Sequence, residues 1–285
     1  MSSSSRPSAT SGPWPADWLR VDLGEQVGAC MTARSLGAPG VQSHGSYEGF
    51  NLGTHVGDAP DAVAAHRRYV ESLAGSPALW MNQIHGNTVV RATPQAAVQD
   101  LTIDADGCIA TEPGVVCTVM VADCLPILLA APGGCGVGAL HAGWRGLAGA
   151  GAMAGRGIVE SGISALCEAT GSDPQDLQAW LGPCIGPQHF EVGADVLRGF
   201  GVDAAHSPGA LVGEAAAHFR FHRMGADGLP RWLADLPGLA QDRLKALGVQ
   251  RISGGQWCTV SDPSRFYSFR RERVTGRQAA CIWLR

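Results

Sequence analysis

Two histidines and one cysteine are the side chains of this sequence best suited to metal chemistry. His85 lies in the segment QIHG, Cys124 in ADCLP and His141 in LHAGWRG. In each segment a strand-like apolar run meets glycine or proline. Neutral imidazole and thiolate are both zinc ligands, and three protein ligands leave the fourth tetrahedral position for water or substrate. These residue types therefore predict a catalytic Zn²⁺ site, although copper accepts the same ligands and the sequence leaves the metal open.

The spacing of the three residues belongs to no local metal-binding motif, because 38 residues separate His85 from Cys124 and 16 separate Cys124 from His141. A cysteine inside an apolar run is usually a small buried hydrophobic residue. A histidine at a strand end is often a satisfied core or surface group. A metal site formed by these side chains therefore requires a fold that brings distant strand ends together.

Two other chemistries use the same residues. Cys124 as a thiolate nucleophile, with His85 or His141 as its base, makes a Cys-His amide hydrolase that needs no metal. That arrangement uses only one of the two histidines, which favours coordination. The other alternative is a binding protein with a structural zinc, and it requires a fourth protein ligand such as Cys184 or Cys258.

The composition restricts what else the chain can do. It has 285 residues with 21 Lys+Arg against 25 Asp+Glu, a formal net charge of −4. No basic surplus exists to release counterions from nucleic acid, which excludes a general polyanion binder. A hydrophobic fraction of 45% with 16% charged residues is typical of a folded globular chain. The 39 glycines and 17 prolines favour short strands joined by tight turns over a helical bundle.

Cysteine usage and the N-terminus bear on the compartment. The nine cysteines are odd in number and include no C-x-x-C pair, so no disulfide framework is expected. Residues 1–18 are serine-rich without the apolar core of a signal peptide, which predicts a disordered leader on a cytoplasmic protein. The most apolar stretch, 115–131, is 17 residues long and contains Asp123 and Pro126. It is too short for a membrane span and indicates buried strand instead.

Hydrophobic periodicity predicts alternating strands and helices after residue 18, with no repeat or linker that divides the chain. Near-continuous apolar runs at 114–121, 127–131 and 136–140 indicate strands buried on both faces. A helix is expected at 143–169. Each of its glycines costs about 1 kcal/mol relative to alanine, so we expect another element to pack tightly against the glycines. The remaining expected elements are strands within 19–32 and at 79–83, 88–91, 179–181, 249–252, 266–270 and 278–284, and helices at 61–73, 192–200 and 236–247.

A series of short segments resembles the laccase-domain family, also called the multicopper polyphenol oxidase family. HAGWRG and ADCLP are its most specific motifs, and the matches run in order over roughly 27–284, nearly the whole chain. The segments are NLG at 51–53, HVGD at 55–58, QIHG at 83–86, DADG at 104–107, ADCLP at 122–126, HAGWRG at 141–146, GPCIGP at 182–187, FEVG at 190–193, CT at 258–259, FYSFRR at 266–271 and TGR at 275–277.

The resemblance implies a fold and a ligand set. The fold is a single-domain α/β sandwich with mixed β-sheets flanked by helices, which here covers residues 19–285. The metal is held by two histidines and one cysteine, which correspond to His85, Cys124 and His141. One segment departs from the family pattern: residues 37–45 differ where the family has a glycine-glycine-valine-serine run.

The resemblance also implies two different activities. Members are similar to zinc-dependent enzymes that phosphorolyse adenosine, inosine, guanosine and methylthioadenosine and deaminate adenosine. The older label implies a copper-dependent laccase, and a role in editing peptidoglycan precursors is a further family-level possibility. Laccases of the multicopper type need about ten histidine ligands, whereas this chain has nine histidines in all. Deamination needs only one metal-activated water, and phosphorolysis needs a phosphate aimed at the ribose C1′.

Five polar residues are candidates for contacts to a purine nucleoside and phosphate. Arg145 suits the phosphate because it lies between two glycines at the start of an expected helix, where backbone N–H groups attract anions; a surface arginine is the alternative. Asp123 is expected to hold a ligand histidine in one tautomer. Gln83, two residues before the first ligand, can bond a purine edge, and Asn51 and Arg34 are similar candidates near glycine-rich loops.

Arginines are also concentrated near the C-terminus, at 265, 270, 271, 273 and 277. They can reach a phosphate, but alternation at 266–270 makes a solvated strand face the ordinary interpretation.

Overall fold

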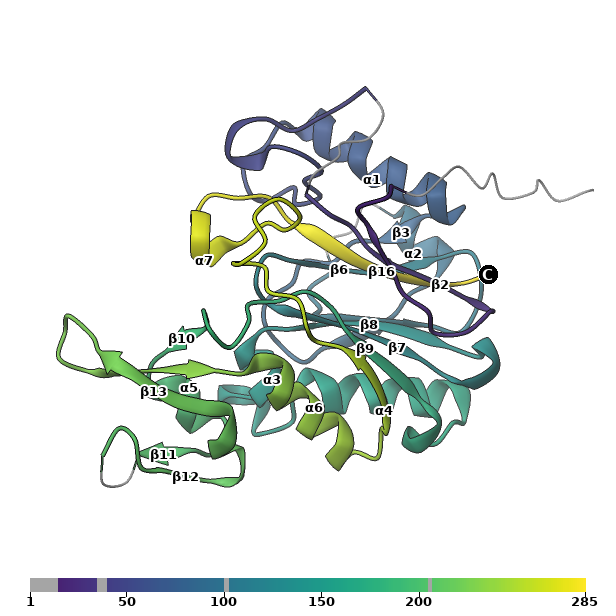
Figure 1. The fold of residues 1–285 in the computed structure, drawn as a ribbon. Coiled ribbons are helices and arrows are strands. Elements are labelled where there is room, and N and C mark those ends of the chain that lie inside the picture. The colour runs from purple at the N-terminus through teal and green to yellow at the C-terminus, as the bar shows by residue number, and fades with distance from the viewer. Residues whose placement is uncertain (1–14, 35–39, 100–102, 205–206) are drawn as a thin grey trace, which may run out of the picture.

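Two β-sheets packed face to face form the centre of the molecule in this computed structural model, which describes residues 15–34, 40–99, 103–204 and 207–285 (Figure 1). The first sheet has the strand order β1-β2-β16-β6-β3 and the second has the order β15-β9-β7-β8-β5-β4. The strands of the first sheet are β1 Leu19–Arg20, β2 Val27–Met31, β3 Ala78–Leu79, β6 Val116–Val121 and β16 Gln278–Leu284. Those of the second are β4 Val89–Arg91, β5 Gly107–Ala110, β7 Leu125–Ala130, β8 Val137–Ala142, β9 Gln178–Leu181 and β15 Arg251–Gly254.

The apolar runs form strands covered on both faces, as their sequences predict. In β7, Ile127 and Leu129 point to the helices outside the second sheet, whereas Leu128 and Ala130 point to the first sheet. Every residue of β6, β7 and β8 is buried. The near-continuous hydrophobicity of these segments follows from that two-sided burial.

Helices cover the two outer faces of the pair of sheets (Figure 1). Helix α1 Pro60–Ala74 packs Val70 against the first sheet, and it ends at Gly75, whose φ of 72° lies in the left-handed region that glycine adopts readily. Helices α4 Ile158–Thr170 and α6 Leu236–Ala246 pack against the second sheet. The molecule is thus a one-domain α/β sandwich with mixed sheets, which confirms the predicted fold class.

The prediction of one helix at 143–169 is wrong. The structure has two helices, α3 Trp144–Ala148 and α4, joined through glycines in the left-handed conformation. Gly149 has a φ of 67° and Gly155 a φ of 85°, which interrupts the i to i−4 hydrogen-bond ladder. The predicted tight packing exists on α4, where Gly162 lies against Leu140 of β8.

The prediction of a strand at 266–270 is also wrong. Phe266 and Tyr267 are both buried, so they do not alternate between a core face and a solvent face. Ser268 then caps a short helix, α7 Phe269–Glu272, by accepting a hydrogen bond from the amide of Arg271. The strand expected at 79–83 stops at Leu79, as β3.

A smaller β-structure projects beside α3 and α6 (Figure 1). One three-stranded sheet has the order β10-β14-β13, and β11 pairs with β12. These strands are β10 Glu191–Val192, β11 Asp203–Ala204, β12 Leu211–Val212, β13 Phe219–Met224 and β14 Pro230–Ala234, and the two remaining helices are α2 Pro94–Val98 and α5 Ala194–Gly199. None of the described helices has the length and apolarity that a membrane crossing requires.

Two sequence predictions extend beyond the described residues. Residues 1–14 of the expected leader lie outside them, whereas Trp18, at its end, is buried against the edge of Phe50. Residues 37–39 of the segment that departs from the family pattern also lie outside the described part.

Candidate metal centre

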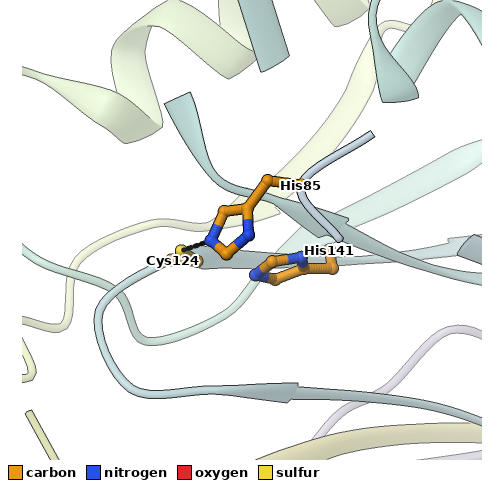
Figure 2. Close-up of side chains that lie close together, drawn as sticks. All are labelled: His85, Cys124 and His141. Carbon is orange, nitrogen blue, oxygen red and sulfur yellow. Dashed lines mark hydrogen bonds between the residues drawn. The ribbon is translucent and has the colours of Figure 1, made fainter. Parts of the chain in front are cut away.

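His85, Cys124 and His141 converge on one point between the ends of three segments (Figure 2). One ligand atom from each residue lies within 4.8 Å of the other two. The Cys124 Sγ is 3.7 Å from Nε2 of His85, and the two imidazole rings meet edge to face with centroids 4.9 Å apart. His141 is buried, Cys124 is half-buried and His85 is exposed. The group is therefore fixed in the core on one side and open to ligands on the other.

The pairing of β7 with β8 brings two of these residues together. Pro126 is the register partner of His141, so the turn before β7 places Cys124 beside the end of β8. Asp123 has a φ of 106°, a conformation that L-residues rarely adopt. Its carboxylate accepts hydrogen bonds from the Thr259 hydroxyl at 2.6 Å and from the Arg270 amide at 2.6 Å. These bonds hold the turn that carries the cysteine.

A single buried carboxylate, Asp106, positions both histidines. Its Oδ1 accepts hydrogen bonds from Nδ1 of His141 at 2.8 Å and from the amide of His85 at 2.9 Å. Its Oδ2 accepts from the amides of Ile84 and Gly86 at 3.2 and 2.6 Å. Because Nδ1 of His141 is engaged, Nε2 is the nitrogen left to bind a metal, and the same carboxylate fixes the tight loop that carries His85.

Glycines of the HAGWRG segment allow the ligands to approach the backbone closely. A Cβ atom on Gly143 would lie 2.7 Å from Cδ2 of His85 and 3.2 Å from Sγ of Cys124. A Cβ atom on Gly146 would lie 2.7 Å from the carbonyl oxygen of Gly86. Side chains at either position would therefore displace the loop that carries His85.

The electrostatics of the centre favour a thiolate. Burial raises the pKa of Cys124, but the charges and hydrogen bonds of His141 and His85 outweigh burial and lower it. Burial lowers the pKa of His141, but the Cys124 charge and the Asp106 hydrogen bond outweigh burial and raise it. Burial also raises the pKa of Asp106, and its bonds from His141 and the neighbouring amides bring it below the ordinary value. Thiolate is the form in which cysteine binds metals.

The donor set fits a zinc ion with an open coordination position. Two imidazole nitrogens and one thiolate are typical zinc donors, and three protein ligands are the number found in catalytic rather than structural sites. Within the described residues, neither Cys184 nor Cys258 joins the group. Cys184 is buried in the core, and Cys258 Sγ instead accepts a hydrogen bond from the amide of Gly186 at 3.2 Å.

A cavity of about 320 Å³ opens onto the three donors. The residues that line it include Gln83, Phe269 and Arg277. This volume is within the range of about 300–1,000 Å³ that small-molecule sites occupy. Arg277 was visible in the sequence only as one of several C-terminal arginines, and the TGR segment was the one signal that distinguished it.

Two of the sequence candidates lie beside the metal ligands with their polar groups engaged. Gln83 lines the cavity, but its amide donates to the carbonyl oxygen of Met120 at 2.7 Å and accepts from the Met120 amide at 2.8 Å. Asp123 is occupied by the bonds to the C-terminal segment described above. Within the described residues, neither side chain has a hydrogen bond to the imidazole of His85 or His141. Gln83 joins the segment before His85 to β6, and Asp123 joins the turn of Cys124 to the C-terminal segment.

The other three candidates lie outside this cavity. Asn51 is buried and bonds the amides of Gly53 and Arg277 through its oxygen. Arg34 pairs with Glu272 at 2.6 Å, on the wall of a different surface depression. Arg145 lies in the first turn of α3, as expected, but it is exposed, and its guanidinium stacks on the neighbouring indole of Trp144, 4.5 Å from the ring centroid.

The fold and the site define an α/β sandwich protein with a His-Cys-His group that can hold a metal. The family model described as multi-copper polyphenol oxidoreductase laccase matches residues 28–285. The chain belongs to this laccase-domain family.

Relatives with assigned names support that membership. A protein of Pseudomonas aeruginosa named purine nucleoside phosphorylase is 39% identical over 271 residues, which cover 95% of this chain and 96% of the relative. The purine nucleoside phosphorylase YfiH of Escherichia coli is 38% identical over 263 residues, 90% of this chain and 94% of its own length.

Solved structures agree with the fold. A Neisseria meningitidis protein superposes with a TM-score of 0.78 at 39% identity and covers 94% of this chain and 99% of its own. YlmD of Geobacillus stearothermophilus superposes with a TM-score of 0.77 at 28% identity, with coverage of 92% and 93%.

Proposed function

We propose that this protein is a zinc-dependent purine nucleoside phosphorylase that also cleaves methylthioadenosine and deaminates adenosine. The observation that carries the proposal is the convergence of His85, Cys124 and His141 beside a cavity of nucleoside size. The two relatives described above are both named purine nucleoside phosphorylase, which supports the substrate class. The nine free cysteines favour the cytoplasm as the proposed compartment, because a reducing compartment keeps thiols unpaired.

The residues of the chain have distinct parts in this chemistry. His85, Cys124 and His141 hold the metal, and Asp106 fixes the orientation of both histidines. A bound zinc ion supplies Lewis-acid activation of water or of a substrate oxygen. Phe269 lines the cavity and is 46% exposed, and it is the aromatic residue proposed to stack on the purine.

Two reactions share this site in the proposal. In phosphorolysis, a phosphate oxygen forms a bond to C1′ of the ribose as the bond from C1′ to the purine nitrogen breaks. The electron pair leaves with the purine nitrogen, which takes up a proton from solvent, and ribose 1-phosphate is the second product. In deamination, water replaces the amino group at C6 of adenosine, and the products are inosine and ammonia.

A Cys-His amide hydrolase is the second candidate, because the contact between Cys124 and His85 also suits a thiolate with a neighbouring base. Such an enzyme uses the thiolate as nucleophile and does not depend on a metal. A copper-dependent oxidoreductase remains the alternative in the family's description. The histidine content argues against it, since the nine histidines fall short of the roughly ten ligands that the multicopper type needs.

Metal analysis followed by product chromatography tests the proposal. Purified protein is analysed for zinc and copper and then incubated with adenosine, with and without inorganic phosphate. We expect about one zinc per chain, inosine in both reactions, and adenine with ribose 1-phosphate only when phosphate is present. Chelation and Cys124→Ala should each abolish all products, and zinc should restore activity after chelation only. Cys135→Ala is the matched control, because Cys135 is an exposed free thiol outside the site.

Each alternative gives a different result. Product formation that survives both chelation and Cys124→Ala would remove the metal hypothesis. Loss of activity toward an amide substrate in Cys124→Ala, unaffected by chelation, would favour the hydrolase. Oxidation of a phenol by copper-loaded protein, without turnover of nucleosides, would favour the oxidoreductase.

A further inference from the structure

A second cavity adjoins the one at the metal centre. It has a volume of about 430 Å³, and the two cavities share four wall residues. Those residues are His55, Met81, Asn82 and Met120. The two cavities therefore adjoin along this wall, and the groove that they make up has the metal ligands in one part and the side chains of Arg67 and Trp80 in the other.

Arg277 enters the part of the groove at the metal centre with one edge of its guanidinium fixed. Nη1 donates to the carbonyl oxygens of Thr275 and Gly276 at 3.1 and 3.0 Å. Its backbone amide donates to Oδ1 of Asn51 at 2.8 Å. Within the described residues, Nε and Nη2 have no hydrogen-bond partner and no carboxylate pairs with the guanidinium. The free edge therefore remains for a ligand in the cavity that this residue lines.

Arg67 enters the other part of the groove in a similar state. Its Nε donates to the carbonyl oxygen of Leu52 at 3.0 Å, and its guanidinium lies over the indole of Trp80, 4.3 Å from the ring centroid. The described residues include no acidic side chain in an ion pair with it. Burial lowers the pKa of this guanidinium to about 10, and it stays cationic at neutral pH. Nη2 donates to Sδ of Met120 at 3.7 Å. Stacking fixes the plane of the side chain, and within the described residues Nη1 is the nitrogen left without a hydrogen-bond partner and available for an anion.

His55 connects the two arginines. It lines both cavities. Burial is the largest cause that lowers the pKa of His55, and the positive charges of Arg277 and Arg67 lower it further. Of the described residues that line the groove, none is aspartate or glutamate. Glu71 acts on Arg67 from outside the groove, and the charges of Cys124 and Asp123 act on Arg277. The groove walls themselves thus carry two guanidinium groups and no carboxylate, an arrangement that attracts a negatively charged ligand.

We infer that His55, Arg67 and Arg277 form an anion subsite that binds inorganic phosphate as the co-substrate. The inference rests on the proposed function for the identity of the anion. Guanidinium groups bind phosphate through paired charge-assisted hydrogen bonds, and the free edge of Arg277 supplies such a pair next to the metal centre. The subsite is separate from Arg145, whose side chain is exposed and lines neither cavity.

The test compares phosphate-dependent and phosphate-independent reactions in the same zinc-loaded protein. Arg277→Gln and Arg67→Gln are measured beside Arg68→Gln, a control on the same helix whose side chain is exposed. We expect the KM for phosphate to rise at least tenfold in Arg277→Gln and several-fold in Arg67→Gln. Adenosine deamination consumes no phosphate, so in both variants it should fall several-fold less than phosphorolysis does. Arg68→Gln should change neither reaction.

Direct binding separates a failure of this inference from a failure of the proposed function. Titration calorimetry with inorganic phosphate on the zinc-loaded wild-type protein should show binding that Arg277→Gln weakens at least tenfold. This binding result supports the subsite even if no nucleoside is turned over. An unchanged phosphate affinity and KM in both variants overturns it, as does a loss of phosphate binding in Arg145→Gln alone. An equal loss of deamination and phosphorolysis in Arg277→Gln also overturns it, because the residue would then serve the metal centre as a whole.

Discussion

Asp106 and His141 are joined by two hydrogen bonds, one through side chains and one through the backbone. Nδ1 of His141 donates to Oδ1 of Asp106 at 2.8 Å, and the amide of His141 donates to the Asp106 carbonyl oxygen at 2.7 Å. The carboxylate also accepts from the amide of His85. One buried side chain therefore sets the tautomer of one proposed ligand and the loop conformation of the other.

Asp106→Asn should weaken metal binding more than it weakens the fold. An amide presents one acceptor oxygen where the carboxylate presents two, so it cannot satisfy all four N–H donors. Loss of such a partner behind a metal-bound histidine typically lowers metal affinity by about 10–100-fold. Competition with a chromophoric chelator measures the affinity, with Asp203→Asn, an exposed position, as the control. Unchanged affinity in Asp106→Asn would show that other contacts position the histidines.

Most of the buried strands could be predicted from the sequence because their signals are local, and the three metal-ligand candidates could be named from their residue types and from the family resemblance. Runs such as 127–131 are apolar on both faces, and the structure buries them on both faces. His85, Cys124 and His141 stand out by residue type at strand ends, and the structure brings their ligand atoms within 4.8 Å of one another.

The parts that sequence reasoning missed depend on contacts between distant segments. Asp106 is separated by 35 positions from His141. It lies in the DADG segment that resembles the family, but that segment does not indicate that the carboxylate is buried and bonded to the loop of His85. The sequence left the side-chain amide of Gln83 as a candidate for a substrate contact, but in the structure this amide makes two hydrogen bonds to the backbone of Met120. Arg277 gains its significance only from the groove that it shares with His55.

Errors in secondary structure have a related origin. From the sequence, the glycines between α3 and α4 could belong to one tightly packed helix. Their left-handed φ values in the structure show that α3 ends there instead. The segment 266–270 has the composition of a strand, but it becomes a turn into α7 because the Arg270 amide bonds the carboxylate of Asp123.

Gly143→Ala should disturb the metal centre through volume alone. The φ of Gly143 is −67° and its ψ is 159°, which alanine adopts without strain. The added Cβ would lie 2.7 Å from Cδ2 of His85 and force the ring away from Cys124. We expect metal affinity to fall about tenfold or more, in line with the loss of other supporting contacts at metal sites. Gly209→Ala, where a Cβ meets nothing within 4 Å, is the control. Equal metal affinity in the two variants would contradict the steric argument.

Gly162→Ala should destabilise the fold although alanine is the better helix former. A Cβ at this position of α4 would lie 2.5 Å from Cδ1 of Leu140, a side chain that is fully buried. The gain in helix propensity is about 1 kcal/mol, and overpacking costs about 1–3 kcal/mol, so we expect a net loss of about 1 kcal/mol in urea denaturation. Ala169→Gly, at an exposed position of the same helix, calibrates the propensity term. A Gly162→Ala protein more stable than wild type would show that the Leu140 side chain moves aside without cost.

Glu272→Gln should change how stability depends on acid. Glu272 pairs with Arg34 at 2.6 Å and accepts a hydrogen bond from the Thr275 hydroxyl at 2.6 Å. Burial raises the pKa of Glu272, but these two bonds and the neighbouring charges outweigh burial and lower it. A carboxyl whose folded pKa lies below the unfolded value of about 4.3 stabilises the fold above that pH, and the contribution is lost as the pH falls through the folded pKa.

We therefore expect Glu272→Gln to cost about 1–2 kcal/mol at pH 7 and progressively less below about pH 4, as measured by urea denaturation at several pH values. Glu112→Gln, whose side chain is 76% exposed, should show no such difference. A cost for Glu272→Gln that stays constant from pH 7 to below pH 4 would contradict this account.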